Sequence, residues 1–169
     1  HVGDVRGART AGALSVAVAT GPCPADELRA AGAAAVLADL SVFPAESFDL
    51  VFHPISNVFA PNVRPVWHEA FRVLRHGGTL LAGIINPFEY TFDQRLMAQG
   101  ILQVKYALPY SDLADLTAEE RNQVFGADAA LEFSHTLDDQ IGGQLAAGFH
   151  LIGFYEDRRR DSLIARYMP

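Results

Sequence analysis

Apolar residues in this chain gather in short runs that alternate with stretches of amphipathic, helical spacing. The runs predict buried strands at residues 14–20, 35–38, 48–52, 79–85 and 149–155. The amphipathic stretches, with their flanking proline and glycine residues, predict helices at residues 24–31, 63–75, 118–124 and 137–147. This alternation predicts an α/β fold in which helices cover both faces of a mostly parallel sheet.

Individual residues mark the ends of two of these helices. Pro24 suits the first position of its helix, and Gly32 suits the position after its end. Gly77 and Gly78 are expected to end the helix that starts near Val63. The residues that we assign to the core from their spacing are Val66, Phe71, Leu74, Leu80, Leu81 and Ile84.

The composition limits the classes of partner. The 169 residues are 50% hydrophobic, which predicts one globular unit with enough apolar side chains for a core. The chain carries 13 Lys and Arg residues against 20 Asp and Glu residues, which argues against nucleic acid as a ligand. A single cysteine, Cys23, excludes an internal disulfide and a multi-cysteine metal site. The N-terminal residues show neither a signal peptide nor an apolar run of about 18 residues, so we expect a cytoplasmic protein without a membrane partner.

The stretch LSVAVATGPCPADELRAAG, residues 14–32, has the strand-turn-helix layout of a nucleotide-binding domain. Phosphate-binding loops of the dinucleotide type need glycines two residues apart, so that backbone N–H groups can approach the ligand. None of the 14 glycines lies two residues from another, and Pro22 removes a backbone donor from the turn itself. We therefore interpret this stretch as an ordinary packing unit.

Residues 1–41 contain the stretches HVGDVRGARTAGALSVAVATG and PADELRAAGAAAVLADL. These stretches resemble the C-terminal end of a haloacid-dehalogenase-like hydrolase. The resemblance implies that Asp4, which follows Gly3, is an acid that helps to hold Mg²⁺. The nucleophile of that family lies in an Asp-x-Asp motif, and this chain contains none. A phosphatase therefore lacks its nucleophile here.

The second segment, residues 42–169, contains the stretches FPAESFDLVFHPISNVF, VWHEAFRVLRHGGTLLAGIINP and EFSHTLDDQIGGQLAAGFHLIGFYED. Over about residues 42–167 it resembles the C-terminal half of a class I S-adenosylmethionine-dependent methyltransferase. His76 stands where that family usually has proline. The resemblance implies a Rossmann-like sheet, here incomplete, and S-adenosylmethionine as cofactor.

Candidate cofactor-binding residues follow from this resemblance. The motif HPISN ends a predicted strand at the carboxyl edge of a parallel sheet, where ligands of such folds bind. The family uses this edge for the methionine part of the cofactor and for the acceptor, and it often reads the adenine ring at the place of ADL. The resulting candidates are Asp39, Leu40, His53, Pro54, Ser56 and Asn57. Ser56 and Asn57 could alternatively cap the next helical turn. The imidazole of His53 could form its hydrogen bond with the backbone and not with a ligand.

Candidate acceptor-binding residues lie beyond the strand over residues 79–85. They are Asn86, Tyr90, Tyr110 and His135. Residues 86–115 are irregular in pattern, which indicates a lid or a substrate-binding insertion. The two tyrosines could alternatively lie in the core. Thr136, Asp138 and Asp139 lie near the start of a predicted helix, so helix capping explains them. No spacing among the six histidines indicates a metal site.

These features together predict an S-adenosylmethionine-dependent methyltransferase with a small-molecule acceptor. The chain lacks the Gly-rich loop of that family, its ribose-binding acid and its final strand, so one interpretation is an incomplete and inactive domain. The joint between residues 1–41 and 42–169 indicates a gene fusion, a fragment artefact or one diverged domain. The alternatives are a hydrolase remnant and a non-catalytic domain that pairs through an open sheet edge, for example as a homodimer.

Overall fold

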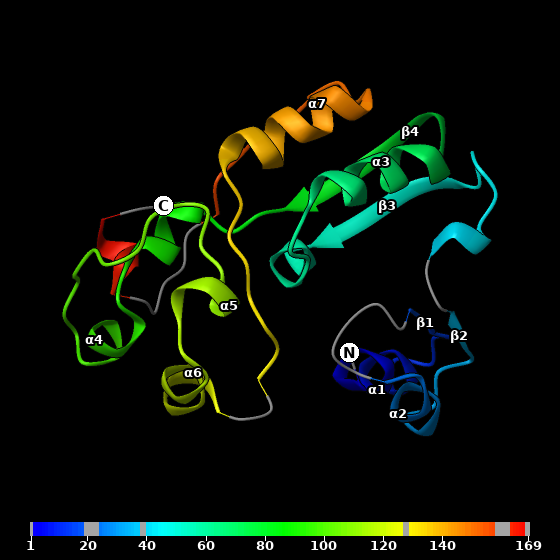
Figure 1. Cartoon of the computed structure of the whole chain (residues 1–169). Coiled ribbons are helices and arrows are strands. Elements are labelled where there is room, and N and C mark those ends of the chain that lie inside the picture. The colour runs from blue at the N-terminus through cyan, green and yellow to red at the C-terminus, as the bar shows by residue number, and fades with distance from the viewer. Residues whose placement is uncertain (1, 19–23, 38–39, 127–128, 158–162, 168–169) are drawn as a thin grey trace.

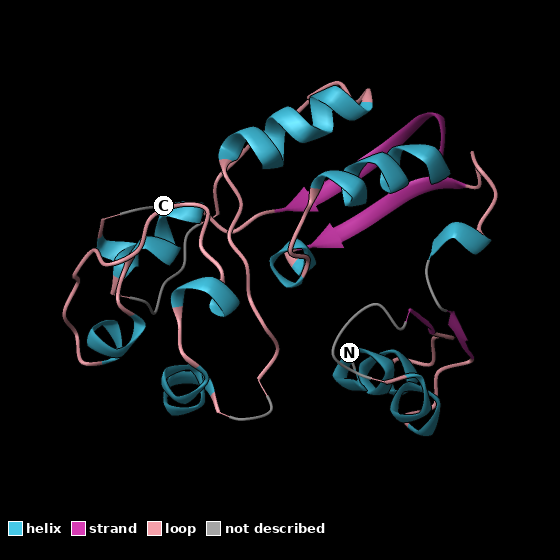
Figure 2. Ribbon diagram, in the orientation of Figure 1, coloured by secondary structure: helices cyan, strands magenta, loops and turns pink. Residues whose placement is uncertain are grey.

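Two small parallel sheets form the framework of the protein in a computed structural model that describes residues 2–18, 24–37, 40–126, 129–157 and 163–167 (Figures 1 and 2). The first sheet pairs β1 with β2, and the second pairs β3 with β4. The strands are β1 (Val16–Val18), β2 (Ala35–Leu37), β3 (Phe48–Pro54) and β4 (Leu74–Gly83). Both pairs are parallel, as the alternation of strands and helices predicted.

Helices of the first half precede or connect these strands. They are α1 (Val2–Thr10), α2 (Ala25–Ala30) and α3 (Arg64–Val73), with short 3-10 turns η1 (Leu40–Val42) and η2 (Ser56–Phe59). The predictions over residues 24–31 and 63–75 are confirmed by α2 and α3. Asp4 lies in α1.

Short helices make up most of the second half. They are η3 (Pro87–Thr91), α4 (Gln94–Ala98), α5 (Asp112–Asp115), α6 (Ala118–Phe125), the π-helical turn η4 (Asp138–Gly142), α7 (Gly143–Ala147) and η5 (Ile164–Arg166). The helices predicted over residues 118–124 and 137–147 are confirmed by α6 and by η4 with α7. No helix in the part of the chain that the structure describes is long and apolar enough to cross a membrane.

Gly77 and Gly78 do not end α3, in contrast to the prediction. The helix ends at Val73, and the glycines lie inside β4, where the register against β3 shifts between Phe48 and Leu50. A Cβ on Gly78 would lie 2.9 Å from the backbone oxygen of Arg75, so only glycine fits this irregular part of the strand.

The hydrophobic core is divided into separate clusters. Val5, Ala17, Leu28 and Ala31 form one cluster around the β1–β2 sheet. Another joins α3 to α7 through Val63, Trp67 and Ala147, with Leu80 and Ala82 of β4 packed against it. A third contains Val58, Tyr90 and Tyr110. Figure 1 shows α3 and α7 on the same side of the β3–β4 sheet.

Two groups of sequence predictions for the second sheet are wrong. Residues 149–155 form no strand, because no neighbouring strand pairs with them in the described structure. Of the predicted core residues, Leu74 is buried and Val66, Leu80 and Ile84 are partly buried, but Phe71 and Leu81 are exposed for 45% and 44%. Leu81 points away from α3, because successive strand residues alternate between faces and its neighbour Leu80 packs on the helix side.

Candidate functional site

A strained turn follows directly after β3, at the carboxyl edge of the second sheet. We call residues 53–57 the β3 turn: His53 and Pro54 end β3, Ile55 follows, and Ser56 and Asn57 begin η2. Ile55 has φ 62° and ψ −3°, a left-handed conformation that is unusual for a β-branched residue. Its backbone N–H donates to the carbonyl oxygens of His53, at 3.1 Å, and Gly83, at 3.2 Å. Strained residues of this kind cluster at functional sites, and parallel sheets bind ligands at this edge.

Gly83 of the neighbouring strand β4 makes room for this turn. A Cβ at this position would lie 3.2 Å from Cγ1 of Ile55 and 3.4 Å from its backbone nitrogen. The first distance is shorter than most carbon contacts, and the second is at the lower limit of ordinary contact, so a side chain here would press on Ile55 and glycine leaves room for it.

The imidazole of His53 has one engaged and one free nitrogen. Its Nδ1 lies 3.4 Å from Oγ of Ser56, and its ring meets the ring of Trp67 edge to face, with centroids 5.4 Å apart. Nε2 is buried and has no hydrogen-bond partner in the structure. Burial lowers the pKa of His53, because it disfavours the charged form.

Asn57 is the most deeply buried polar residue of the β3 turn, at 0% exposure. Its Nδ2 donates to Oε1 of Gln140 at 2.8 Å, and its backbone oxygen lies 3.1 Å from Nε2 of His135. Its Oδ1 is buried without a partner. Buried polar atoms are almost always hydrogen-bonded, so the free oxygen makes Asn57 a candidate for ligand binding.

Further hydrogen bonds connect Trp67, which packs on His53, to the start of η4. Nε1 of the fully buried Trp67 donates to the backbone oxygen of Asp139 at 3.0 Å. Arg64 donates from Nε to Asp139 at 2.7 Å, and this bond, with a further one from Thr136, lowers the pKa of the Asp139 carboxyl. Oγ1 of Thr136 also accepts the backbone N–H of Asp139 at 3.1 Å, as the capping interpretation predicted.

The structure brings only some of the predicted site residues together. His53, Pro54, Ser56 and Asn57 share the β3 turn, and His135 contacts it through the backbone of Asn57. Neither Ser56 nor Asn57 caps η2. Asp39 lies outside the described residues, and Leu40 begins η1.

Asn86, Tyr90 and Tyr110 make hydrogen bonds within the second half of the protein, and the two tyrosines pack against Val58, the residue after the β3 turn. Oδ1 of Asn86 accepts the backbone N–H of Phe88 at 3.1 Å and so caps η3. Tyr90 and Tyr110 stack on each other in the core, with centroids 5.6 Å apart.

The hydroxyls of these two tyrosines are already occupied. Tyr90 donates to Glu132 and Tyr110 donates to Asp112, each at 2.7 Å. Burial, followed by these bonds, raises the pKa of both tyrosines. The arrangement agrees with the alternative that placed the tyrosines in the core.

Sequence reasoning missed the contributions of Gln140, Trp67 and Ile55. Gln140 lies 83 residues from Asn57 in the chain, and nothing in the local pattern links them. Trp67 does fall on the predicted apolar face of its helix, which is the one available signal. The conformation of Ile55 has no signal in its residue type.

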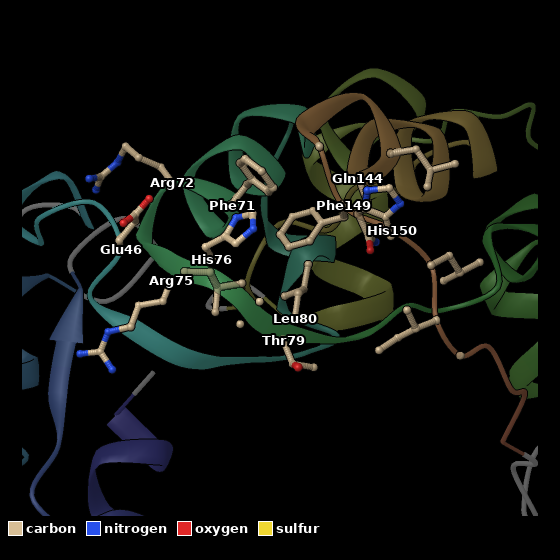
Figure 3. Close-up of a pocket in the computed structure, with 18 of the residues that line it drawn as sticks. Glu46, Phe71, Arg72, Arg75, His76, Thr79, Leu80, Gln144, Phe149 and His150 are labelled. Carbon is tan, nitrogen blue, oxygen red and sulfur yellow. The ribbon is translucent and has the colours of Figure 1, made fainter.

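A cavity of about 770 Å³ lies elsewhere, beside the first half of β4 (Figure 3). The rings of Phe71 and Phe149 meet there edge to face, and Leu80 lies beneath them. The arginines at its rim, Arg72 and Arg75, are paired with Glu69 and Asp49. The cavity borders the start of β4 and not the carboxyl edge, so we regard the β3 turn as the better candidate site.

No group of three or more His, Cys, Asp or Glu residues in the described parts of the chain could hold a metal ion.

Residues 12–82 match the family model described as a methyltransferase domain. Over 120 residues the chain is 51% identical to the uncharacterized methyltransferase YbaJ of Bacillus subtilis (strain 168). The match covers 71% of this chain and 47% of that relative, so the chain spans about half the length of the relative.

A solved structure of an S-adenosylmethionine-dependent methyltransferase from Mesorhizobium loti has a similar fold. Its TM-score to this chain is 0.57 at 17% identity, and the superposition covers 96% of this chain and 76% of the other. The similarity confirms the Rossmann-like α/β fold class. The comparisons do not show a hydrolase, and the methyltransferase match already begins within residues 1–41.

Proposed function

We propose that this chain, which is related in sequence and fold to the class I S-adenosylmethionine-dependent methyltransferases, forms the part of such an enzyme that binds the cofactor and a small-molecule acceptor at the β3 turn. The comparisons support the methyltransferase relationship. This proposal adds two claims to that relationship: that the methyl acceptor is a small molecule, and that the site lies at the β3 turn.

One observation carries the choice of site. Nε2 of His53 and Oδ1 of Asn57 are both buried without partners, and both belong to the strained turn at the carboxyl edge of β3. A merely structural turn would satisfy these atoms, because an unpaired buried polar group costs about 1–3 kcal/mol.

The residues present fit part of what S-adenosylmethionine requires. When bound, this cofactor supplies an activated methyl group on a sulfonium ion. The protein then has to align donor and acceptor and to exclude water, which needs no catalytic motif of fixed sequence. The β3 turn offers polar atoms for orientation, and the buried ring of Trp67 excludes water behind them.

Thermal unfolding of the chain with and without S-adenosylhomocysteine tests the proposal. A ligand that binds the folded state alone raises the unfolding midpoint. We expect a concentration-dependent rise with S-adenosylhomocysteine and none with ATP, which shares the adenosine but not the amino acid part. A cooperatively folded sample with no rise would show that this chain does not hold the cofactor.

A second, non-catalytic role is favoured by the open face of the β3–β4 sheet. Leu50 and Phe52 of β3 are exposed for 57% and 64%, on the face opposite α3. Parallel sheets usually have both faces covered, and large exposed apolar areas often mark interaction surfaces. Light scattering over a range of concentrations tests pairing with a second copy. A strict monomer at all concentrations would count against it.

A further inference from the structure

The outer edge of β4 has no neighbouring strand among the described residues. β4 pairs with β3 alone, in a sheet of two strands. A strand with one neighbour leaves a row of unpaired backbone N–H and C=O groups along its other edge. Natural edge strands usually carry a charged residue or a proline that prevents further pairing, yet residues 79–83 of β4 contain neither. This part of the edge is therefore open to another strand.

Residues 149–155 border the same cavity as this edge. The cavity of about 770 Å³ is lined by Thr79 and Leu80 of β4 and by residues 148–153 (Figure 3). Residues 149–155 have the apolar composition of a strand, but no backbone hydrogen bond joins residues 150–155 to another described residue. An unpaired strand edge and a segment with unpaired backbone groups thus face one cavity.

The two walls favour an extended peptide as the occupant of the cavity. An extended backbone between them can form hydrogen bonds with both, as a central strand does, whereas a small molecule cannot pair with two rows of backbone groups. Apolar side chains of such a peptide find apolar partners, because Phe71 of α3 and Phe149 line the cavity with their rings edge to face, 5.1 Å apart.

The direction of residues 149–155 shows which peptide fits. Figure 1 shows α7 running against the arrow of β4 and the chain turning back after α7, so residues 149–155 run in the same direction as β4. A two-fold axis perpendicular to the sheet, placed beside these residues, brings the same segment of a second copy antiparallel to them and to β4. The segment of the second copy then lies between β4 and residues 149–155 of the first copy, and the reverse holds for the second copy.

We propose that two copies of this chain pair through this cavity, and that each copy inserts its residues 149–155 into the cavity of the other. The result is one continuous sheet across the two copies. The contact is isologous, so a single arrangement pairs both open edges and both unpaired segments at once. Ile152 and Tyr155, which are exposed for 88% and 79%, become part of this contact. The surface differs from the open sheet face that carries Leu50 and Phe52.

Charges at the ends of the paired segments support the antiparallel arrangement. Arg75 and His76, at the start of β4, are exposed and line the cavity, and Glu46 is the one acid among the lining residues. Arg75 bonds Asp49 with Nη1, so its Nε and Nη2 can bind a further carboxylate. Glu156 follows the inserted segment, and the antiparallel direction brings Glu156 of the second copy to the start of β4.

Sedimentation velocity over a hundredfold range of concentration tests the pairing on the chain of residues 1–169. We expect a monomer–dimer equilibrium for the wild type. Ile152→Pro should weaken the dimer about tenfold or more, because proline removes a backbone donor, does not fit inside a sheet, and is repeated in both copies. Leu14→Pro is the matched control, since Leu14 is an apolar residue that is exposed for 90% and does not line the cavity. This control should leave the dimer unchanged.

Two further measurements locate the contact. Hydrogen exchange at backbone amides of residues 150–155 should be slower at concentrations where the dimer dominates than in the dilute monomer, because these amides gain partners. Glu156→Lys should weaken the dimer about three- to tenfold, since it places like charges together in both copies. Phe52→Thr, a change on the open sheet face, should leave the dimer unchanged.

The contrary outcomes are equally specific. A wild type that stays monomeric over the whole range, a dimer that Ile152→Pro does not weaken, or a dimer without slower exchange in residues 150–155 would overturn the proposal. A dimer weakened by Phe52→Thr and not by Ile152→Pro would place the contact on the open sheet face instead. Ile152→Pro should unfold cooperatively at the midpoint of the wild-type monomer, which shows that it is folded. No measurement requires S-adenosylhomocysteine, so the result is independent of the proposed cofactor binding.

Discussion

The side-chain amide of Asn57 donates to Oε1 of Gln140 at 2.8 Å and thereby joins the β3 turn to the π-helical turn η4, 83 residues away in the chain. Both residues are buried, at 0% and 2% exposure. Because a buried amide is costly to leave unpaired, this bond fixes the position of the turn against the second half of the protein.

Replacement of this partner should destabilise the protein. Gln140→Leu leaves Nδ2 of Asn57 buried without an acceptor, so we expect the free energy of unfolding to fall by about 1–3 kcal/mol. Urea unfolding measures this change. In a double-mutant cycle with Asn57→Leu, the double variant should lose less than the sum of the single variants. Simple additivity would show that the two side chains do not interact energetically.

Gly83→Ala should disturb the β3 turn more than its size suggests. The added methyl would lie 3.2 Å from Cγ1 of Ile55, which the strained backbone cannot easily move away. We expect a loss of about 1–3 kcal/mol, typical of overpacking, and weaker binding of S-adenosylhomocysteine. Gly153→Ala is the control, because no atom lies within 4 Å of its added Cβ. A Gly83→Ala variant as stable as Gly153→Ala would contradict the close approach of the two strands.

His53 should make the folded state sensitive to mild acid. Burial lowers the pKa of His53 from its ordinary value of 6.5 in the folded state, while the unfolded chain keeps the ordinary value. Below that value the unfolded state therefore binds more protons, and stability falls as the pH falls. Urea unfolding between pH 7.5 and pH 5.5, a range of about one unit on either side of the unperturbed pKa, should show a decline that is smaller in His53→Phe than in the wild type. Identical declines would place the titrating group elsewhere.

Asp139 should contribute a separate loss of stability at lower pH. Its hydrogen bonds with Arg64 and Thr136 lower its pKa from the ordinary value of 3.8 in the folded state. The contribution is present above that value and is lost as the pH falls through the lowered pKa. The stability difference between wild type and Asp139→Asn should thus shrink as the pH is lowered toward and below 3.8. Glu46→Gln serves as the matched control. Glu46 is an exposed acid whose backbone N–H donates to the carbonyl oxygen of Arg72.

Tyr110→Phe distinguishes a core tyrosine from an acceptor-binding one. The change removes the donor to Oδ1 of Asp112, a carboxylate that is almost fully buried. We expect the free energy of unfolding to fall by about 1–3 kcal/mol, because a bond to a charged, buried group is lost. The rise in midpoint with S-adenosylhomocysteine should be unchanged. Normal stability with altered ligand binding would instead favour the acceptor-binding interpretation.

The sequence by itself determined the local elements and the place where the candidate site is found. The apolar face of residues 63–75 became α3, and the run before HPISN became β3, which carries His53 at its carboxyl end and is followed by Asn57 in η2. Such periodicities are properties of neighbouring residues, so one sequence contains them in full. Trp67 lies within the helix that the sequence predicted over residues 63–75, but its contact with His53 is a property of the tertiary structure.

Only the tertiary structure decided how these elements are completed. Residues 149–155 have the composition of a strand but form none, since a strand needs the hydrogen bonds of a neighbour. Gly77 and Gly78 could end a helix, yet they lie in β4, where the register against β3 shifts. The acceptor for Asn57 comes from Gln140, and the strain at Ile55 is held by its bond to Gly83. These contacts join residues far apart in the chain, and their partners are selected by packing and by the cost of unpaired buried groups, which no local pattern records.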